Sequence, residues 1–302
     1  MVREHLPHRA SGWGQLIDDW ERVREPLVAL VSWAESDGRA GPPGEVAPPP
    51  LPSEAAGIFA IGANFATHAA QSQFAIDGGG ERVEARIAAL LENRRSGVPP
   101  WGFTILPRTV AGPGEPIGRP PGAELLDYEG EVGAVLRRAH AGVSVWGVAA
   151  FHDVSVRDPH LKVGRRIDEG PITWVLQKNF RGGSAFGPWV VVDEGLDEHD
   201  LEIVTRVNGE VRQRGNTSEM VYGFADVIDY LDVCVPLRSG DVIASGTPAG
   251  TAFESGLDGA YLRDGDLVEI DVRRIGVLAN RVVPAPQDAA GQTETAGTGA
   301  AQ

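Results

Sequence analysis

LDYEGEVGAV, residues 126–135, places three carboxylates at alternate positions and then continues as an apolar run. Successive side chains of a β-strand point to opposite faces, so Asp127, Glu129 and Glu131 would share one face of a strand. Like charges at that spacing repel one another, and a divalent cation with oxygen ligands, such as Mg²⁺ or Mn²⁺, would relieve the repulsion. The residues alone leave a second interpretation open, an exposed acidic edge strand that binds no ion.

The composition indicates a globular protein and argues against two classes of partner. The chain has 302 residues, 42% hydrophobic and 23% charged, enough for one large domain or one domain with a small appendage. Its 42 acidic and 27 basic residues give a formal net charge of −15. Nucleic acids and anionic membrane surfaces attract positively charged proteins, so we expect neither as a partner.

Cysteine usage and the N-terminal residues indicate a reducing compartment. Cys234 is the single cysteine, which excludes an intrachain disulfide, and we expect it to be a small buried apolar group. The N-terminal residues lack the apolar stretch of a signal peptide, and no run of about 18 apolar residues is present that would cross a membrane. We therefore expect a cytoplasmic location.

Proline and glycine divide the chain into three parts. Residues 13–35 carry apolar side chains at helical spacing, and Pro26 is expected to kink or divide this helix. The Pro-rich stretch 41–52 is a stiff connector, so residues 1–52 form a small N-terminal helical segment and residues 53–284 the main body. Residues 285–302 lack Leu, Ile, Val and aromatic side chains, which predicts a disordered tail.

The main body is predicted to be a β-rich α+β domain. Residues 58–61, 242–244 and 267–272 are predicted strands, and Asn208-Gly209 between two alternating segments predicts a type I′ hairpin. A helix is predicted over residues 81–95, inside an insertion of about residues 72–103, and another helix is capped by Thr217 or Ser218. No P-loop, dinucleotide-binding glycine motif, nucleophile-elbow serine or HExxH zinc motif is present, which argues against those enzyme classes.

Five segments in this order resemble the fumarylacetoacetate hydrolase family: GANFATH at 62–68, the acidic stretch at 126–135, FHDVSVRD at 151–158, QKNF at 177–180 and GTPAG at 246–250. The resemblance extends from about Ile58 to Val283 and includes the predicted hairpin and the sequence NTSEM at 216–220. It implies a C-terminal-domain fold of mixed β-sandwich or β-roll type with few helices. It also favours a metal site over an acidic strand without an ion.

The resemblance implies that Glu129, Glu131 and Asp153 are ligands of Mg²⁺ or Mn²⁺. Three carboxylates exceed the charge of one divalent ion, and Lys178, which the family places beside the metal, would restore the balance. Taken alone, Asp153 fits equally well an ion pair with Arg157, and Lys178 fits a solvated lysine. The metal site therefore depends on the resemblance and on the chemistry of the carboxylates together.

The resemblance also assigns the groups that act on the substrate. His68 would be the general base that activates water, since an imidazole titrates near neutral pH. Gly246 and Thr247 would hold the substrate carboxylate through a backbone amide and a hydroxyl, and Arg157 is a further candidate for substrate binding. Taken alone, His68 fits an ordinary surface or core histidine, and the glycine-threonine pair fits a tight turn. Asp127 fits either a supporting role beside the metal or simple strand polarity.

Two residues near the predicted site depart from the family pattern. The family has a glutamate three residues after the catalytic histidine, where this chain has Gln71, and an asparagine where this chain has His152. Gln71 can accept a hydrogen bond from the imidazole one helical turn away, but it carries no charge to stabilise an imidazolium. Three explanations stay open: Glu81 or Glu84 replaces the carboxylate, the reaction needs no strong base, or the activity is weak.

Other residues are candidates for lining the predicted site or for binding a second carboxylate of the substrate. Arg181 stands where the family has an aspartate. Arg181, Arg165 or Arg166 would suit recognition of a second substrate carboxylate, although a solvated arginine explains each of them as well. Trp101 and Phe103, at the end of the insertion, predict either a lid or pocket wall or a dimer contact.

The predicted function is that of a divalent-metal-dependent hydrolase. It would cleave a C–C bond in an acylpyruvate or similar 1,3-diketo acid through an enolate held by the metal and Lys178. One alternative is a 2-oxo acid decarboxylase, tautomerase or isomerase acting on an oxaloacetate-like or unsaturated dioic acid. Another is a metal-binding protein that has lost catalysis, for which Gln71 is the one argument. Because family members commonly dimerise, we expect a homodimer.

Overall fold

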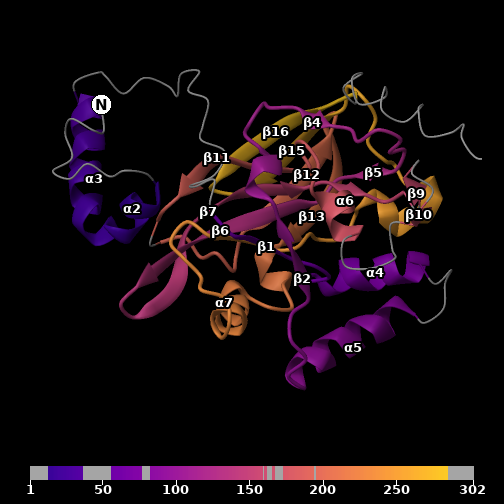
Figure 1. Ribbon diagram of the computed structural model, residues 1–302, viewed down its shortest axis with the longest axis horizontal. Helices are drawn as coiled ribbons and strands as arrows, with labels where there is room; N and C mark the ends of the chain where they lie inside the picture. The colour runs from indigo at the N-terminus through magenta and orange to yellow at the C-terminus, as the bar shows by residue number, and fades with distance from the viewer. Residues whose placement is uncertain are drawn as a thin grey trace, which may run out of the picture.

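The computed structural model describes residues 13–36, 56–76, 82–158, 160–161, 165–166, 173–193 and 195–284. The predicted connector at 41–52 and the predicted tail at 285–302 lie outside these residues. The described part is a mixed α+β fold, rich in sheet and with few helices, as predicted (Figure 1). Among these residues, no helix combines the length and the apolar character needed to cross a membrane.

The larger sheet has seven strands, in the order β2 (Gly102–Ile105), β1 (Ile58–Ile61), β14 (Val242–Ala244), β6 (Gly130–Ala139), β7 (Gly142–Asp153), β11 (Ser184–Val191) and β3 (Val110–Ala111). Neighbouring strands are antiparallel, except that β1 pairs with β14 and β11 with β3 in parallel. The predicted strands β1 and β14 are confirmed. Most of their side chains are buried, which suits strands covered on both faces.

The smaller sheet has five strands, in the order β13 (Glu210–Asn216), β12 (Glu202–Val207), β15 (Leu267–Val272), β16 (Gly276–Val283) and β4 (Ile117–Gly118). Burial alternates along β15, as its sequence pattern predicts. Asn208 and Gly209 join β12 to β13 with φ angles of 51° and 82°. Positive φ at both positions is the geometry of a type I′ turn, so the predicted hairpin is confirmed.

The two sheets pack face to face and enclose the main hydrophobic core. Both inner faces supply fully buried apolar side chains, among them Val132, Ala150, Ile203, Ile270 and Leu278. At Gly130 the sheets come close together, since a Cβ there would lie 2.1 Å from Thr205 Oγ1 on β12. The glycine between Glu129 and Glu131 is therefore required by the packing of one sheet on the other.

The helices lie around the sheets rather than between them (Figure 1). The α-helices are α2 (Trp13–Asp18), α3 (Trp20–Ser36), α4 (Ala66–Ile76), α5 (Val83–Arg95), α6 (Thr173–Lys178) and α7 (Phe224–Asp232). The short 3₁₀ helices are η1 (Pro107–Thr109), η2 (Thr217–Glu219) and η3 (Ala252–Asp258). Two further sheets have two strands each: β5 (Leu126–Asp127) pairs with β8 (Ser155–Val156), and β9 (His160–Leu161) pairs with β10 (Arg165–Arg166). Ile17 of α2 is fully buried in a second core with Ile58 and Phe151, so α2 packs on the outer face of the larger sheet.

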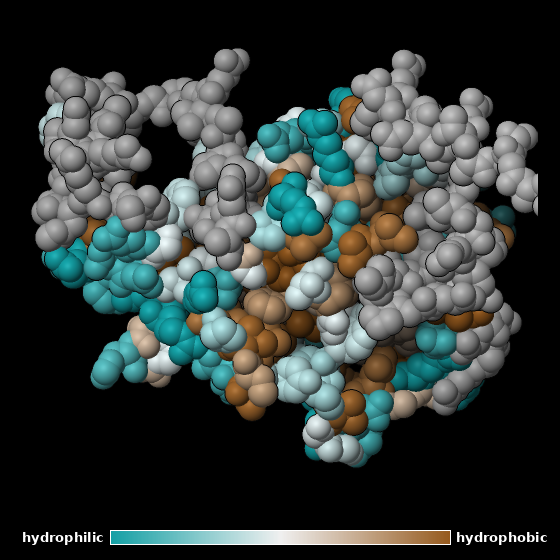
Figure 2. All heavy atoms as spheres, in the orientation of Figure 1, coloured by the Kyte–Doolittle hydropathy of each residue, from teal (hydrophilic) through white to brown (hydrophobic). Residues whose placement is uncertain are grey.

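Figure 2 shows the same face of the molecule with its side chains. Apolar residues gather over the central part, and hydrophilic residues cover the projecting end of the β6–β7 hairpin. Along β6 the side chains change from buried at Gly130 to exposed at Ala139. The acidic start of β6 is therefore the buried end of the strand, and the interpretation as an exposed acidic edge strand is wrong.

Several predicted boundaries need correction. The N-terminal helix divides at Asp19, whose carbonyl accepts from the N–H groups of Arg22 at 2.8 Å and Val23 at 3.1 Å, and it does not divide at Pro26, which lies inside α3. The helix α4 runs for 11 residues and ends at Ile76, so the predicted insertion at 72–103 begins inside a helix rather than after it. Cys234 is exposed at the turn after α7 and is not a buried apolar group.

The predicted helix cap at Thr217 or Ser218 is also wrong. Asn216 accepts from the Ser218 N–H at 2.8 Å and so caps η2 rather than the predicted α-helix. That helix, α7, begins later, after Gly223, whose N–H donates to Asp226 Oδ2 at 2.9 Å. The chain thus makes a separate turn between the β13 strand and α7.

Candidate active site

Three buried carboxylates meet at the inner ends of β6 and β7. Glu129 immediately precedes β6, Glu131 is the second residue of β6, and Asp153 ends β7. The Asp153 N–H donates to the Glu129 carbonyl at 3.0 Å, which fixes the register between the two strand ends. One oxygen from each carboxylate lies within 4.8 Å of the others, and the residues are only 6%, 2% and 1% exposed.

Asp127 does not share a face with these carboxylates, contrary to the expectation from strand alternation. The acidic stretch is not one strand, because β5 ends at Asp127 and β6 begins only at Gly130. The Asp127 carboxylate turns toward η3 and accepts from the N–H groups of Ala252 at 2.8 Å and Phe253 at 3.2 Å. Burial raises the pKa of Asp127, against the opposing effect of Arg157. Asp127 therefore holds the start of η3 in place.

Two cations lie against the carboxylates. Lys178 Nζ is 2.7 Å from Glu129 Oε2 and 2.7 Å from Asp153 Oδ2, and the residue is only 2% exposed. The interpretation of Lys178 as a solvated lysine is therefore wrong. Arg157 donates to Asp127 Oδ2 at 3.2 Å and to Glu129 Oε1, so among the described residues it forms ion pairs with these two carboxylates rather than with Asp153.

The electrostatics of the cluster are uneven. Burial raises the pKa of Glu131 well above its usual range, and burial, with the charge of Glu129, raises the pKa of Asp153 to about 6. Burial would also raise the pKa of Glu129, but Lys178 and Arg157 outweigh it and lower the pKa to about 2. Negative charge at Glu131 and Asp153 is thus costly until another cation approaches.

The donor set fits a hard divalent cation. With Asp127 included, four carboxylates face two cations, which leaves an excess of two negative charges, the charge of one such ion. Asp153 Oδ1 is buried and has no hydrogen-bond partner among the described residues. Carboxylate oxygens are the ligands that Mg²⁺ and Mn²⁺ prefer, so Glu129, Glu131 and Asp153 are suited to hold either ion.

His68 is paired with a carboxylate that the sequence did not reveal. His68 lies on α4, and its Nδ1 is 2.6 Å from Glu254 Oε1 on η3, with both side chains almost buried. Glu254 also accepts from the N–H of Gly250 at 2.9 Å and from Thr251 Oγ1 at 3.3 Å. These donors orient the carboxylate, and the carboxylate orients the imidazole.

Glu254, rather than Gln71, Glu81 or Glu84, is the hydrogen-bond partner of His68. Within the described residues no hydrogen bond joins Gln71 to His68, and Gln71 does not line the cavity described below. Glu84 is exposed on α5, and Glu81 lies outside the described residues. The one sequence signal for Glu254 is that it follows the GTPAG segment by four residues.

The glycine-threonine loop adjoins the carboxylate cluster. Gly246 has a φ of 80°, and its N–H donates to Glu131 Oε2 at 3.1 Å. Thr247 Oγ1 donates to the Gly130 carbonyl at 3.0 Å and accepts from Gln213 Nε2 at 2.8 Å. Gln213 also donates to the Pro248 carbonyl at 2.7 Å and accepts from the Gly130 N–H at 2.9 Å. Gln213, which sequence reasoning missed, thus connects the loop to the start of β6.

Eight of these residues line one cavity of about 330 Å³. Its charged end is formed by His68, Glu129, Glu131, Asp153, Arg157, Lys178, Gly246 and Thr247. Trp101 and Phe103 also line the cavity, in agreement with the predicted pocket wall. Arg181 is exposed and is not among the lining residues, and the side chains of Arg165 and Arg166 lie outside the described part. His152 is buried, which lowers its pKa to about 3, and it does not line the cavity.

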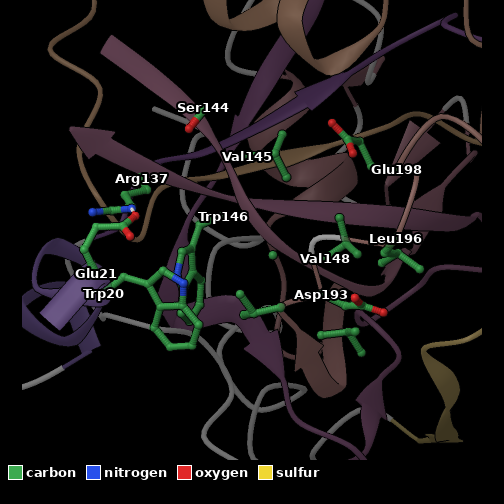
Figure 3. Close-up of a pocket in the computed structure, with 13 residues that line it drawn as sticks. Trp20, Glu21, Arg137, Ser144, Val145, Trp146, Val148, Asp193, Leu196 and Glu198 are labelled. Atoms are coloured by element: carbon green, nitrogen blue, oxygen red, sulfur yellow. Dashed lines mark hydrogen bonds and ion pairs between the residues drawn. The ribbon is translucent and has the colours of Figure 1, made fainter. Parts of the chain in front are cut away.

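A second cavity, of about 280 Å³, lies between the N-terminal helices and the larger sheet (Figure 3). Trp20 and Trp146 meet edge to face there with their ring centroids 5.1 Å apart, and Arg137 pairs with Glu21 at 2.6 Å. None of the site residues predicted from the sequence lines it. The cavity that contains the carboxylate cluster is therefore the candidate active site.

Comparison with known proteins gives three kinds of match. The sequence model of the Fumarylacetoacetate (FAA) hydrolase C-terminal domain matches residues 57–283. The mitochondrial oxaloacetate tautomerase of Homo sapiens is 33% identical over 190 residues, which cover 60% of this chain and 58% of that protein. The structure of 5-carboxymethyl-2-hydroxymuconate delta-isomerase from Mycobacterium smegmatis is 30% identical, covering 80% of this chain and 83% of that one, with a TM-score of 0.58. A fumarylacetoacetate hydrolase from Exiguobacterium antarcticum is 28% identical, with 78% of each chain covered and a TM-score of 0.57.

Proposed function

Because the chain belongs to the fumarylacetoacetate hydrolase family, we propose that it is a Mg²⁺- or Mn²⁺-dependent enzyme that hydrolyses a C–C bond in an acylpyruvate. The observation that carries the proposal is the 2.6 Å contact between His68 Nδ1 and Glu254 Oε1 at the edge of the carboxylate cluster. With its Nδ1–H held by a carboxylate, the imidazole has Nε2 available as a base. The missing glutamate at Gln71 therefore gives no reason to expect lost or weak catalysis.

In this mechanism His68 transfers the protons, and Lys178 stabilises the negative charge of the enolate. The bound metal would supply Lewis-acid chemistry and orient the 2-oxo acid end of the substrate. His68 Nε2 takes a proton from water, and the resulting hydroxide attacks the distal carbonyl carbon. The C–C bond then breaks, and its electron pair passes to the pyruvate fragment as an enolate. The His68 imidazolium returns the proton to the enolate carbon, so that a carboxylic acid and pyruvate are released.

Other groups in the cavity orient the substrate and balance its charge. The Lys178 ammonium group, which already contacts Glu129 and Asp153, offers positive charge to the developing enolate. The Thr247 hydroxyl donates to the Gly130 carbonyl and the Gly246 N–H donates to Glu131, so each would have to exchange its present acceptor for a substrate carboxylate in order to bind it. Glu254 stabilises the imidazolium form of His68 between the two proton transfers.

A second candidate function is tautomerisation or isomerisation of a 2-oxo acid. The names of two relatives, an oxaloacetate tautomerase and a hydroxymuconate delta-isomerase, favour it. The same base, His68, would then carry a proton between a carbon and an oxygen or another carbon of the substrate, without the attack of water. Both reactions need an enolate next to a cation, so the cluster alone does not separate them.

The test is a panel of substrates with added Mg²⁺ or Mn²⁺. Acetylpyruvate and benzoylpyruvate report hydrolysis, oxaloacetate reports tautomerisation or decarboxylation, and unsaturated dioic acids report isomerisation. His68→Asn and Glu129→Ala should abolish turnover of the preferred substrate, and His140→Asn, in the exposed β6–β7 hairpin, is the matched control. Turnover of oxaloacetate without any cleavage of acylpyruvates would favour the second candidate and contradict the first.

A further inference from the structure

The candidate active site has two ends of opposite chemistry. The charged end contains the carboxylates, Lys178 and His68. The rest of the lining is mostly apolar: its larger apolar members are Ile61, Ile76, Trp101, Phe103 and Phe253, and its polar members are Ser72 and Gln73. An acylpyruvate bound through its 2-oxo acid end at the charged groups would direct its acyl group toward this apolar side.

The aromatic part of the wall begins directly beside the charged end. Lys178 Nζ lies 5.2 Å from the centre of the Phe103 ring, and the ring centroids of Phe103 and Trp101 are 6.1 Å apart. The Trp101 indole covers the backbone of Gly62, where an added Cβ would come within 1.8 Å of Trp101 Cζ3. The two rings thus adjoin Lys178 on one side and Gly62 on the other, and Trp101 is 49% exposed.

The described lining offers no cation to a second carboxylate. Lys178 and Arg157 are its only lysine and arginine side chains, and each is already in contact with two carboxylates. Arg157 also lies over the Phe253 ring, at 4.9 Å from its centre. A negatively charged distal group would have to leave water and lie against aromatic rings, which is unfavourable.

We propose that Trp101 and Phe103 form a subsite for an uncharged, apolar acyl or aryl group at the distal end of the substrate. The inference rests on the proposed function, because it takes the 2-oxo acid end to bind at Glu129, Glu131 and Asp153. It goes further by separating substrates that share this end: those with a neutral apolar tail are favoured over dicarboxylic acids. Trp101 is the residue that determines this specificity, and its indole would stack on or cover the tail.

The experiment compares three unreactive ligands with the same chelating end, by calorimetry on the Mg²⁺-loaded protein. Oxalate has no tail, N-phenyloxamate has an aromatic tail, and N-(2-carboxyethyl)oxamate has a charged tail. We expect N-phenyloxamate to bind at least about tenfold more tightly than the carboxyethyl compound, the size expected for burying an apolar group. In Trp101→Ala, the ratio of the N-phenyloxamate affinity to the oxalate affinity should fall by about tenfold.

Trp189→Ala is the matched control, because Trp189 is also about half exposed, at 48%, but lies on β11 and does not line the cavity. Trp101→Phe should keep part of the preference and shows that the position tolerates substitution. Equal or tighter binding of the carboxyethyl compound would overturn the inference, as would an unchanged affinity ratio in Trp101→Ala. If oxalate itself does not bind in the presence of Mg²⁺, the proposed function fails and the inference with it.

Discussion

Glu254→Gln removes one charge from the residue that contacts His68 and changes little in its shape. Glu254 accepts three hydrogen bonds, from His68 Nδ1, Thr251 Oγ1 and the Gly250 N–H. A glutamine has one oxygen and one NH₂ group, so it cannot satisfy both sides. With its oxygen toward His68, its NH₂ faces the Gly250 N–H. With its NH₂ toward His68, the imidazole must carry its proton on Nε2 and is no longer a base.

The magnitude follows from these two arrangements. In the first arrangement the glutamine NH₂ group faces the Gly250 N–H at the 2.9 Å distance of the native hydrogen bond, and this contact between two donors costs about 1–3 kcal/mol. At about 1.4 kcal/mol per factor of ten, that alone lowers the rate by about ten- to hundredfold. Loss of the charge that stabilises the imidazolium adds to it, and the analogous change in a serine protease costs about 10⁴ in kcat. We therefore expect kcat to fall by about 10² to 10⁴.

The assay is steady-state hydrolysis of the best acylpyruvate at saturating Mg²⁺. Because Glu254 does not line the cavity, KM should change by less than about threefold. Asp258→Asn, which removes one exposed carboxylate from the same η3, is the control and should be nearly neutral. Gln71→Glu should likewise give little gain in the native background. A kcat for Glu254→Gln within about threefold of the native value would refute the role of Glu254.

Four further predictions follow from the buried contacts of the site. Gln213→Leu leaves two buried backbone groups without partners and should lower the free energy of unfolding by about 2–5 kcal/mol, measured by urea titration, together with a higher KM. The raised pKa values of Asp153 (about 6) and Glu131 mean that these carboxyls hold protons that a divalent ion must displace, so the Mn²⁺ affinity measured by calorimetry should increase as the pH rises through about 6. The same two groups should make the metal-free protein less stable as the pH rises from about 4 to about 6, because their pKa is raised in the folded state, and stability that increased over this range would contradict the assignment. Gly130→Ala places a Cβ against Thr205 and should lower the melting temperature, at a cost of about 1–3 kcal/mol.

The parts of the fold that sequence could predict are those set by local patterns. Strand alternation predicted β15, an Asn-Gly pair predicted the β12–β13 hairpin, and a short apolar run predicted β1. Local patterns failed where a backbone break has a tertiary cause. Asp127 and Glu129 were expected on one face, but the chain leaves the strand between them so that Asp127 can bind the N–H groups at the start of η3.

The parts of the site that sequence missed are contacts between distant segments. His68 and Glu254 are 186 residues apart, and no spacing rule connects them. The family pattern placed the partner carboxylate one helical turn from the histidine, and Gln71 was therefore given a role that η3 fills. Gln213 was missed for the same reason, since its contacts join β13 of the smaller sheet to the start of β6 in the larger sheet and to the glycine-threonine loop.

Gly130 and Gln213 together explain why the metal ligands and the substrate loop lie in a fixed relation. Gly130 separates Glu129 from Glu131, its N–H donates to Gln213, and its carbonyl accepts from Thr247. Gln213 binds Thr247 and Pro248 with its amide nitrogen, so one side chain sets the distance between the start of β6 and the loop. Because Glu131 also accepts from the Gly246 N–H, a shift of the ligand strand would move the loop with it. It follows that ion binding at the carboxylates and carboxylate binding at the loop should be energetically coupled, and that the coupling should weaken when Gln213 is replaced.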